Sequence, residues 1–230
     1  MQNRYTRSRS LHALAAVVPL ALLVNGSAIA AEAGDWILRG SIANVSPNDD
    51  TGGVSGELAG ALSGADIDVE SQTALGLTAG YFVTDRIAIE LLASSQFEHD
   101  LAIEGGALGG TELGSVKHLP PTLSAQYHFD TGSRFRPYVG LGVNYTIFSD
   151  EDVDSEAAAV GVTDIDVDDS TGLAAQVGVD YELGNGWLIN AGVRYIDIEA
   201  DAEVSTATGT TDVDVDIDPW VTNIGIGYRF

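Results

Sequence analysis

The chain has 230 residues with a formal net charge of −24, from 34 acidic and 10 basic residues, and it contains no cysteine. This acidity excludes a nucleic-acid partner, since phosphate binding requires clustered Lys and Arg, and the lack of cysteine excludes disulfides, thiolate metal sites and thiol catalysis. The composition is nevertheless 45% hydrophobic, with a mean hydropathy of +0.11, which is unusual for a soluble acidic protein.

The first thirty residues differ in composition from the rest of the chain. Three arginines come first, an apolar run follows over Leu14–Val24, and small residues occupy positions Ala28 and Ala30. This order is typical of a secretory signal peptide that is cut after Ala30. We therefore expect residues 1–30 to be a cleavable signal peptide and residues 31–230 to form a single domain. The mature chain would keep 7 basic and 34 acidic residues, a net charge of −27.

After this leader, hydrophobic residues alternate with polar or small ones, as they do in β-strands. The clearest case is the end of the chain, where Ile224, Ile226 and Tyr228 share one face while Asn223 and Arg229 share the other. No later segment reaches the roughly 18 continuous apolar residues of a transmembrane helix. Eight segments with this alternation can be drawn: 35–46, 66–83, 86–98, 115–129, 134–148, 164–182, 187–200 and 213–230.

The links between these segments alternate in length. Those after the second, fourth and sixth segments are short, whereas those after the first, third, fifth and seventh are long and rich in Gly and acidic residues. Short turns on one side and long loops on the other are typical of outer-membrane barrels. The sequence therefore predicts an all-β fold: an eight-stranded antiparallel transmembrane β-barrel with short periplasmic turns and long extracellular loops, in the outer membrane of a Gram-negative bacterium. A soluble β-sandwich is the alternative, because it too would alternate.

The two faces of each segment fit lipid on one side and a polar interior on the other. In the third segment the face expected to contact lipid consists of Ile87, Ile89, Leu91, Ala93 and Phe97. The opposite faces carry side chains that would be costly in hydrocarbon, namely Arg39, Glu90, Gln126, Arg136, Asn144, Gln176, Asn190 and Arg194. We expect four of them to form a polar base in the lumen: Arg39, Glu90, Arg136 and Arg194. Aromatic residues gather toward the periplasmic end of the strands: Trp36, Tyr81, Tyr127, Phe129, Phe135, Tyr181, Trp187 and Tyr228.

Several short stretches, in the same order along the chain, resemble one family of outer-membrane proteins. They are Leu119–Leu123, Arg136–Gly140, Gly142–Thr146, Gln176–Tyr181, Asp218–Trp220 and Gly227–Phe230. On these stretches the chain resembles the OmpW family, from about Gly34 to Phe230. The resemblance implies an eight-stranded barrel with a narrow, largely apolar lumen that passes small, mainly hydrophobic molecules across the outer membrane, with release sideways into the membrane.

Two consecutive prolines, Pro120 and Pro121, fall inside a predicted strand. Neither has an N–H group, so the hydrogen-bonded ladder must open locally. In a membrane barrel such an opening exposes carbonyl groups to lipid unless the gap is covered or used. We expect a lateral opening here, and a bulge without function, or a position above the bilayer, is the alternative.

The resemblance also implies an apolar constriction in the lumen, with a leucine at the position of Leu92. By strand alternation Phe148, Ile196 and Ile198 point inward as well, although a small barrel fills its interior with side chains in any case. Thr171 replaces a tryptophan that other family members can carry. We therefore expect the constriction of this protein to be wider or less apolar than theirs.

Other functions have weaker support in the sequence. The histidines after the leader, His99, His118 and His128, lack the spacing of a metal or catalytic site, so we do not expect an enzyme. A structural, adhesion or receptor barrel without transport is the alternative function, and a lumen plugged by Arg–Glu pairs would favour it. The expected partners are outer-membrane lipid and lipopolysaccharide, a small apolar solute, and the barrel-assembly machinery, which would read the terminal Phe230. We expect a monomer or weak oligomer.

Three runs of alternating acidic residues begin segments that descend from long loops, so we place them at an extracellular rim. The residues concerned are Asp66, Asp68, Asp164, Asp166, Asp214 and Asp216. A solvated acidic surface is one interpretation of these runs. The other is that Ca²⁺ or Mg²⁺, which prefer oxygen ligands, orders the rim and bridges it to lipopolysaccharide. No other cofactor is expected.

We predict that the protein isolated from membranes begins at Ala31, because the small residues at Ala28 and Ala30 are those that signal peptidase selects. Intact-mass spectrometry of the membrane fraction measures the start of the chain directly. A chain that retains residues 1–30, or a product found soluble in the periplasm, would contradict both the leader and the membrane location.

Overall fold

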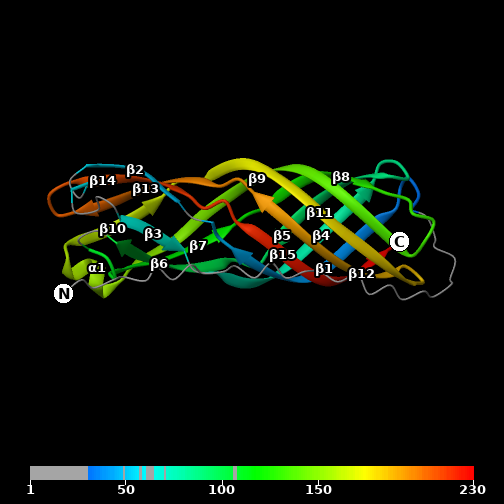
Figure 1. Cartoon of the computed structure of the whole chain (residues 1–230), viewed down its shortest axis with the longest axis horizontal. Coiled ribbons are helices and arrows are strands. Elements are labelled where there is room, and N and C mark those ends of the chain that lie inside the picture. Colours follow the sequence, from blue (N-terminus) through cyan, green and yellow to red (C-terminus); the bar gives the residue numbers. More distant parts are fainter. Residues whose placement is uncertain (1–30, 49, 57–58, 61–64, 70, 106–107) are drawn as a thin grey trace, which may run out of the picture.

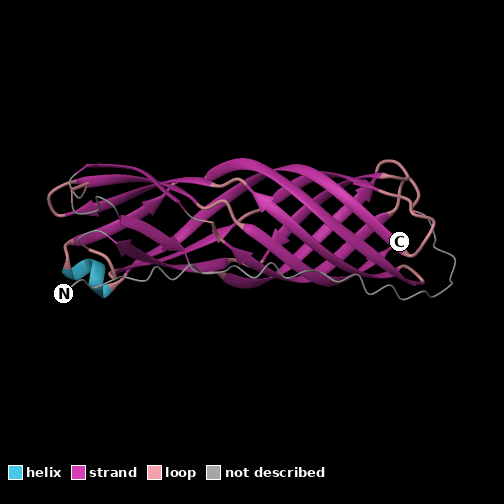
Figure 2. Cartoon of the chain, in the orientation of Figure 1, coloured by secondary structure: helices cyan, strands magenta, loops and turns pink. Residues whose placement is uncertain are grey.

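The computed structural model describes residues 31–48, 50–56, 59–60, 65–69, 71–105 and 108–230. The predicted signal peptide lies outside these residues. Nearly all regular structure is β-strand, and the strands wind about one long axis to give an elongated cylinder (Figures 1 and 2).

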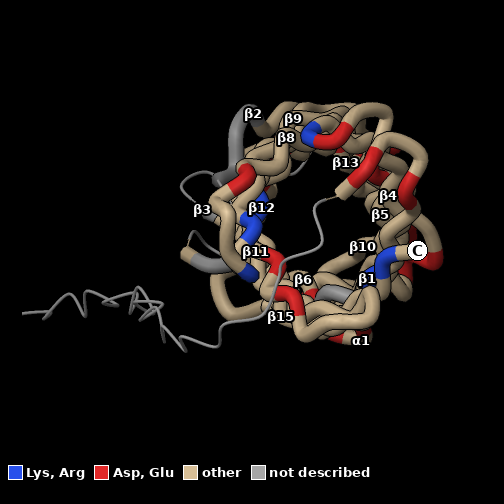
Figure 3. The backbone as a smooth tube through the Cα atoms, turned by 90° about the vertical axis from the view of Figure 1, so that its right-hand side faces the viewer, with Lys and Arg blue, Asp and Glu red and all other residues tan. Residues whose placement is uncertain are grey.

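Eight strands close into a barrel in the half of the cylinder that contains the C-terminus (Figure 1). They are β1 (Trp36–Ser46), β4 (Gln72–Phe82), β5 (Ile87–Ser94), β8 (Thr122–His128), β9 (Phe135–Val153), β11 (Ser170–Gly184), β12 (Trp187–Ile196) and β15 (Trp220–Arg229). Their order is β11-β12-β15-β1-β4-β5-β8-β9, and β9 pairs with β11 to complete the ring that Figure 3 shows end-on. Each neighbouring pair is antiparallel. The prediction of an eight-stranded antiparallel barrel is confirmed.

Short turns join the strands at the end of the barrel nearest the C-terminus. They follow β4, β8 and β11, as the pattern of short links predicts. The tightest is Asn185-Gly186 between β11 and β12, where φ is 52° and 83°. Asn followed by Gly favours the two-residue hairpin turn that requires positive φ at both positions.

The outer wall of the barrel is apolar. Leu141, Leu75 and Leu173 expose 72%, 67% and 66% of their surface, whereas the inward-facing Arg39 and Glu90 expose only 3% and 2%. An apolar exterior of this size is unsuited to water, and it argues against the soluble sandwich. The inward assignment of Arg39 and Glu90 made from alternation is confirmed.

Aromatic rings form a girdle at the short-turn end. Three pairs lie on neighbouring strands, with ring centroids about 5 Å apart: Trp36 with Tyr81, Phe135 with Tyr181, and Trp187 with Tyr228. Such rings mark the interface between hydrocarbon and headgroups. The barrel therefore has its membrane boundary at this end where the sequence predicts it.

Further strands continue the cylinder beyond the barrel, and we call this part the upper tier. They are β2 (Asp50–Gly56), β3 (Ala65–Val69), β6 (Phe97–Gly105), β7 (Glu112–Leu119), β10 (Val162–Val167), β13 (Glu199–Thr206) and β14 (Thr210–Asp216), with the short helix α1 (Ser155–Ala159). One sheet has the order β3-β6-β7-β9 and the other β10-β13-β14-β2. Buried side chains from both sheets form one apolar cluster: Ile103, Leu113, Val162, Ile165, Val204, Val213 and Val215.

The observed strands differ from the eight segments predicted from the sequence. Those at 66–83, 86–98, 115–129, 164–182, 187–200 and 213–230 are each divided between a barrel strand and an upper-tier strand, and the long links are mostly paired strands. Three divisions fall at Pro120-Pro121, at Asp168-Asp169 and at Ile217–Pro219. Proline cannot donate to a ladder, and aspartate side chains bond to neighbouring backbone groups and so compete with regular pairing. Alternation alone does not reveal such breaks because it continues on both sides of them.

Acidic residues lie directly opposite one another in the upper tier. Glu203 of β13 is the register partner of both Asp166 on β10 and Asp212 on β14, and Asp201 is opposite Asp214. All of these side chains are exposed. Like charges directly opposite in a sheet are destabilising. The upper tier therefore carries electrostatic repulsion that salt can screen.

The predicted acidic rim is divided between the two sheets. Asp164 and Asp166 lie on β10, and Asp214 and Asp216 on β14, with β13 between them. Asp66 and Asp68 lie on β3 of the other sheet, and their side chains are outside the described set. Within the described ranges no group of three or more His, Cys, Asp or Glu residues is arranged to hold a metal ion. Cation binding at this rim stays a prediction.

We predict that Glu203→Gln raises the thermal unfolding midpoint by roughly 1–3 °C at low ionic strength, because it removes the central charge of one acidic row. The gain should vanish near 1 M salt, where the Debye length is about 3 Å. Asp164→Asn is the matched control, since Asp164 lies opposite Ser205. Equal effects of the two substitutions would contradict the repulsion.

Millimolar Ca²⁺ at matched ionic strength should stabilise the wild type beyond the salt effect if the rim binds cations.

Candidate functional site

A network of buried ion pairs crosses the lumen of the barrel. Arg39 donates to Glu90 from Nη1 at 2.9 Å, and to Asp180 from Nε and Nη2 at 3.0 and 2.6 Å. Arg194 donates from Nη2 to the other oxygen of Glu90 at 2.9 Å. Each of these side chains exposes 9% or less of its surface. The two-fold contact of Arg39 with Asp180 is the strong bidentate form of this interaction.

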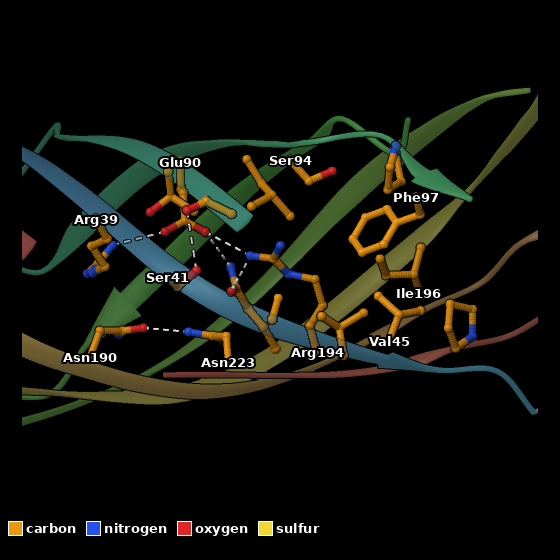
Figure 4. Close-up of a pocket in the computed structure, with 18 of the residues that line it drawn as sticks. Arg39, Ser41, Val45, Glu90, Ser94, Phe97, Asn190, Arg194, Ile196 and Asn223 are labelled. Carbon is orange, nitrogen blue, oxygen red and sulfur yellow. Dashed lines mark hydrogen bonds and ion pairs between the residues drawn. The ribbon is translucent and has the colours of Figure 1, made fainter. Parts of the chain in front are cut away.

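Amide side chains extend the network across the ring (Figure 4). Gln176 accepts a hydrogen bond from Arg194 at 2.7 Å and donates to Glu90 at 3.3 Å. Asn190 donates to Asp180 at 2.9 Å. The carboxylates are therefore bonded on several sides, as buried charges require.

This network, which we call the floor, draws on strands from around the whole barrel. Its charged and amide residues come from β1, β5, β11 and β12. Asn190 also donates to the hydroxyl of Tyr138 on β9 at 3.0 Å and accepts from Asn223 on β15 at 2.8 Å. Two arginines balance two carboxylates, so the floor has no net charge. It places buried, hydrogen-bonded polar groups across the interior of the barrel.

The structure divides the predicted polar base. Arg39, Glu90 and Arg194 meet in the floor, but Arg136 is bonded elsewhere, to Glu182 at 2.7 Å. Glu182 also accepts from Arg229 at 3.1 Å, in a second cluster. Arg136 is buried and faces the lumen, as predicted, but it lies in this second cluster and not with the other three residues. The signal for this was available, since Glu182 shares the inward face of its strand with Gln176.

A small apolar cavity of about 50 Å³ lies on the floor. We call it the apolar chamber, and its apolar walls include Val45, Leu92, Phe97, Pro120, Ile196 and Ile198. A water needs on the order of 10–15 Å³ measured in the same way, so the chamber holds only a few waters when its side chains stand as they do here. A larger guest would have to displace these side chains.

An aromatic layer separates this chamber from a second apolar cavity in the upper tier. Phe97 stacks on His118 with centroids 5.2 Å apart, and His118 lies 5.8 Å from Phe148. The second cavity also measures about 50 Å³. Its lining includes Leu101, Leu113, Val116, Ile165, Val204 and Val215. Apolar cavities are thus stacked along the axis above a polar floor.

Four of the five residues predicted at the constriction face the interior. Leu92, Ile196 and Ile198 line the apolar chamber, and Phe148 packs against the two isoleucines. Thr171 does not belong with them: it is exposed and lies opposite Tyr145 in the ladder, on the outer wall. That prediction is wrong because it ignored the alternation of the strand.

Phe97 shows the opposite error. The sequence places it on the lipid face with Leu91, but it is buried in the chamber wall with 5% of its surface exposed. Ser95 and Gln96 separate β5 from β6 and shift the alternation at this point. Sequence reasoning also missed His118, which precedes the two prolines in β7 and faces inward.

The two prolines interrupt one side of the barrel wall. The strand ends at Leu119 and resumes at Thr122, and the last pair with β5 is Leu92–Thr122. The next pair on this side is Phe97–His118, between β6 and β7. We call the interval between these two pairs the proline seam. Pro120 is buried and lines the apolar chamber, so the seam lies against the chamber.

On its other side the proline segment stays attached to β9. Tyr145 donates its backbone N–H to the carbonyl of Pro121 at 3.1 Å, and the Asn144 amide donates to the same oxygen at 3.3 Å. The loss of pairing is therefore confined to the β5–β6 side.

These features define a class of protein. The ladder of the barrel is closed, its exterior is apolar, its interior holds buried charges and an aromatic girdle lies at one end, which together describe a β-barrel of the outer membrane. No helix in the described part of the chain is long and apolar enough to cross a membrane.

The particular family follows from comparison with known proteins. The chain belongs to the OmpW family, whose sequence profile matches residues 32–230. It is 42% identical over 213 residues to outer membrane protein W of Vibrio cholerae, covering 92% of this chain and 95% of that protein. Relatives named in this way are outer-membrane proteins of Gram-negative bacteria, and the chain shares that location.

Two solved structures are similar to this one. The crystal structure of the outer membrane protein OprG from Pseudomonas aeruginosa matches with a TM-score of 0.79 at 40% identity, over 87% of this chain and 97% of that one. The solid-state NMR structure of outer membrane protein AlkL in lipid bilayers matches with a TM-score of 0.65 at 29% identity, over 90% of this chain and 95% of that one.

We predict that Glu90→Gln lowers the free energy of unfolding by about 3 kcal/mol, because it leaves Arg39 and Arg194 buried with one carboxylate between them. Denaturant unfolding in detergent or lipid vesicles measures this loss. Asp150→Asn is the matched control. It removes the exposed partner of Lys117 in the upper tier and should cost less than about 1 kcal/mol. Similar losses for the two substitutions would show that the floor does not depend on its ion pairs.

Proposed function

We propose that this barrel admits small, mainly hydrophobic molecules from the extracellular side and releases them sideways into the membrane through the proline seam. The observation that carries the proposal is the position of Pro120, which lines the apolar chamber at the place where strand pairing is lost. A solute held in the chamber is one wall away from lipid.

The floor argues against a straight path into the periplasm. An apolar molecule moving that way would separate Arg39 from Glu90 and Asp180, and breaking a buried pair costs about 3–5 kcal/mol. A route through the seam separates no ion pair in the described part of the wall. Because an apolar solute also gains roughly 25 cal/mol for each Å² that it removes from water, lipid is the favoured destination.

Because the chamber is small, a solute could pass only if the side chains around it moved apart. Entry would require Leu92, Phe97 and neighbouring side chains to move apart, because the chamber measures about 50 Å³. Such motion is compatible with a narrow, selective path and unfavourable for bulk flow of ions. Polar solutes would have to give up water in an apolar wall, at a cost that apolar solutes do not have.

A structural, adhesion or receptor barrel without transport is the second candidate, and the closed floor and narrow chamber favour it. Both candidates share the remaining partners that we propose. The outer wall contacts lipid, and the acidic upper tier reaches the lipopolysaccharide. The barrel-assembly machinery reads the last strand, where Phe230 exchanges two backbone hydrogen bonds of 2.9 Å with Trp36 and leaves 61% of its surface exposed.

We predict that Leu92→Arg lowers uptake of a small apolar probe into vesicles at least roughly tenfold, since an apolar guest would have to desolvate the guanidinium in the chamber wall, at a cost of more than about 1.4 kcal/mol. Ala207→Arg is the matched control, because it adds the same charge in an exposed turn of the upper tier.

Replacing both prolines by valine (P120V/P121V) restores N–H donors and should slow transfer of the probe into lipid. Heat-modifiable gel mobility checks that each variant is folded. Unchanged uptake in folded variants would favour the structural or receptor barrel.

A further inference from the structure

The carboxylate of Asp169 bonds to β9 at the point where β9 and β11 stop pairing. The highest pair between these strands is Thr146–Ser170, and above it β10 pairs with β13 instead of β9. Just above that pair, Asp169 accepts the backbone N–H of Phe148 at 3.1 Å. Its second oxygen accepts the hydroxyl of Tyr145 at 2.7 Å.

The same arrangement recurs between β12 and β15. Asp218, which precedes Pro219 and β15 with φ of 37°, accepts the backbone N–H of Ile198 at 3.1 Å and the hydroxyl of Tyr195 at 2.8 Å. In both cases the tyrosine lies three residues before the amide donor. In both cases the aspartate comes one or two residues before the strand that descends into the membrane. We call these two arrangements the Asp169 latch and the Asp218 latch.

The latches satisfy backbone donors where the barrel meets the upper tier. At this level a carboxylate oxygen accepts the N–H of Phe148 and of Ile198 in place of a backbone carbonyl, and an N–H left unpaired in hydrocarbon costs several kcal/mol. A carboxylate oxygen is a stronger acceptor than a neutral carbonyl. Each latch therefore ties two neighbouring strands together at the height where barrel and upper tier meet.

The proline seam lies at the same junction and has no such latch. Among the described residues no carboxylate or amide side chain bridges the interval between Leu92–Thr122 and Phe97–His118. Instead Ser94 has a buried hydroxyl oxygen without a hydrogen-bond partner in the described part of the chain, and it lines the apolar chamber. Within the described part of the chain, charged hydrogen bonds from aspartate side chains hold two of these three places, and none spans the proline seam.

We propose that Asp169 and Asp218 are positioning residues that keep the β9–β11 and β12–β15 interfaces shut, so that lateral release is directed to the proline seam. The tyrosines Tyr145 and Tyr195 hold each carboxylate from the lipid side, and the carboxylate holds the neighbouring strand. The inference rests on the proposed function for its consequence, but the latches themselves have a direct structural signature.

The first measurement reads that signature without reference to transport. Hydrogen exchange of the Phe148 and Ile198 amides, followed by NMR in lipid or detergent, should accelerate at least roughly tenfold in D169A and D218A, respectively. The nearby acids supply matched controls, D168A and D216A, because both of those side chains are exposed. Tyr145→Phe should produce a smaller acceleration at Phe148, since the carboxylate keeps its bond to the amide.

The second measurement uses release of a small apolar fluorescent probe into vesicle lipid. In a P120V/P121V background, where the proline seam is resealed, D169A or D218A should restore release, while D168A and D216A should not. D169N, which keeps an acceptor oxygen for the amide, should restore less release than D169A.

The outcomes distinguish a failure of the proposed function from a failure of the latches. If the wild type releases no probe, the proposed function fails, and the latches are then judged by amide exchange alone. If amide exchange is equal in the latch and control variants, the latches are overturned whatever the transport result. If exchange accelerates but release is not restored, Asp169 and Asp218 stabilise the junction without directing the solute, and the proposal is overturned.

Discussion

Hydrocarbon offers no hydrogen-bond partner to a peptide group, so each N–H and C=O within the bilayer must find one in the chain. The closed ring of eight antiparallel strands meets this requirement along nearly its whole height. The exceptions are concentrated where the barrel joins the upper tier. There Asp169 and Asp218 supply side-chain acceptors, and the proline pair removes the donors altogether. The two aspartate latches and the proline seam therefore both concern the same requirement, which is hydrogen bonding of the backbone in hydrocarbon.

The second organising feature is the mutual neutralisation of charges inside the ring. Arg39 and Arg194 are tolerable in a narrow lumen because Glu90 and Asp180 lie within hydrogen-bond distance of them. Removing water from the lumen strengthens these contacts and makes each of them harder to separate. Above the floor the walls become apolar. Under the proposed function, an apolar solute would meet this apolar wall before the floor, with the proline seam beside it.

Much of this arrangement could be predicted from alternation, because each barrel strand has lipid on one side and the lumen on the other. Leu92, Ile196 and Glu90 were placed correctly on that basis. The errors have different causes, since Thr171 was assigned against the alternation of its own strand. Phe97 changes side after the irregular Ser95-Gln96, and Arg136 has its partner on another strand, which no single segment reveals. Hydrogen bonds between distant strands, such as those of Asp169 and Asp218, depend on tertiary pairing and leave no periodic signal.

The neutrality of the floor has an electrical consequence. A voltage across a membrane does work only on charge that moves, about 2.3 kcal/mol for each elementary charge carried across 100 mV. Displacement of the floor as a unit would carry two positive and two negative charges together, with no net gating charge. A membrane voltage therefore does almost no net work on a concerted displacement of the floor.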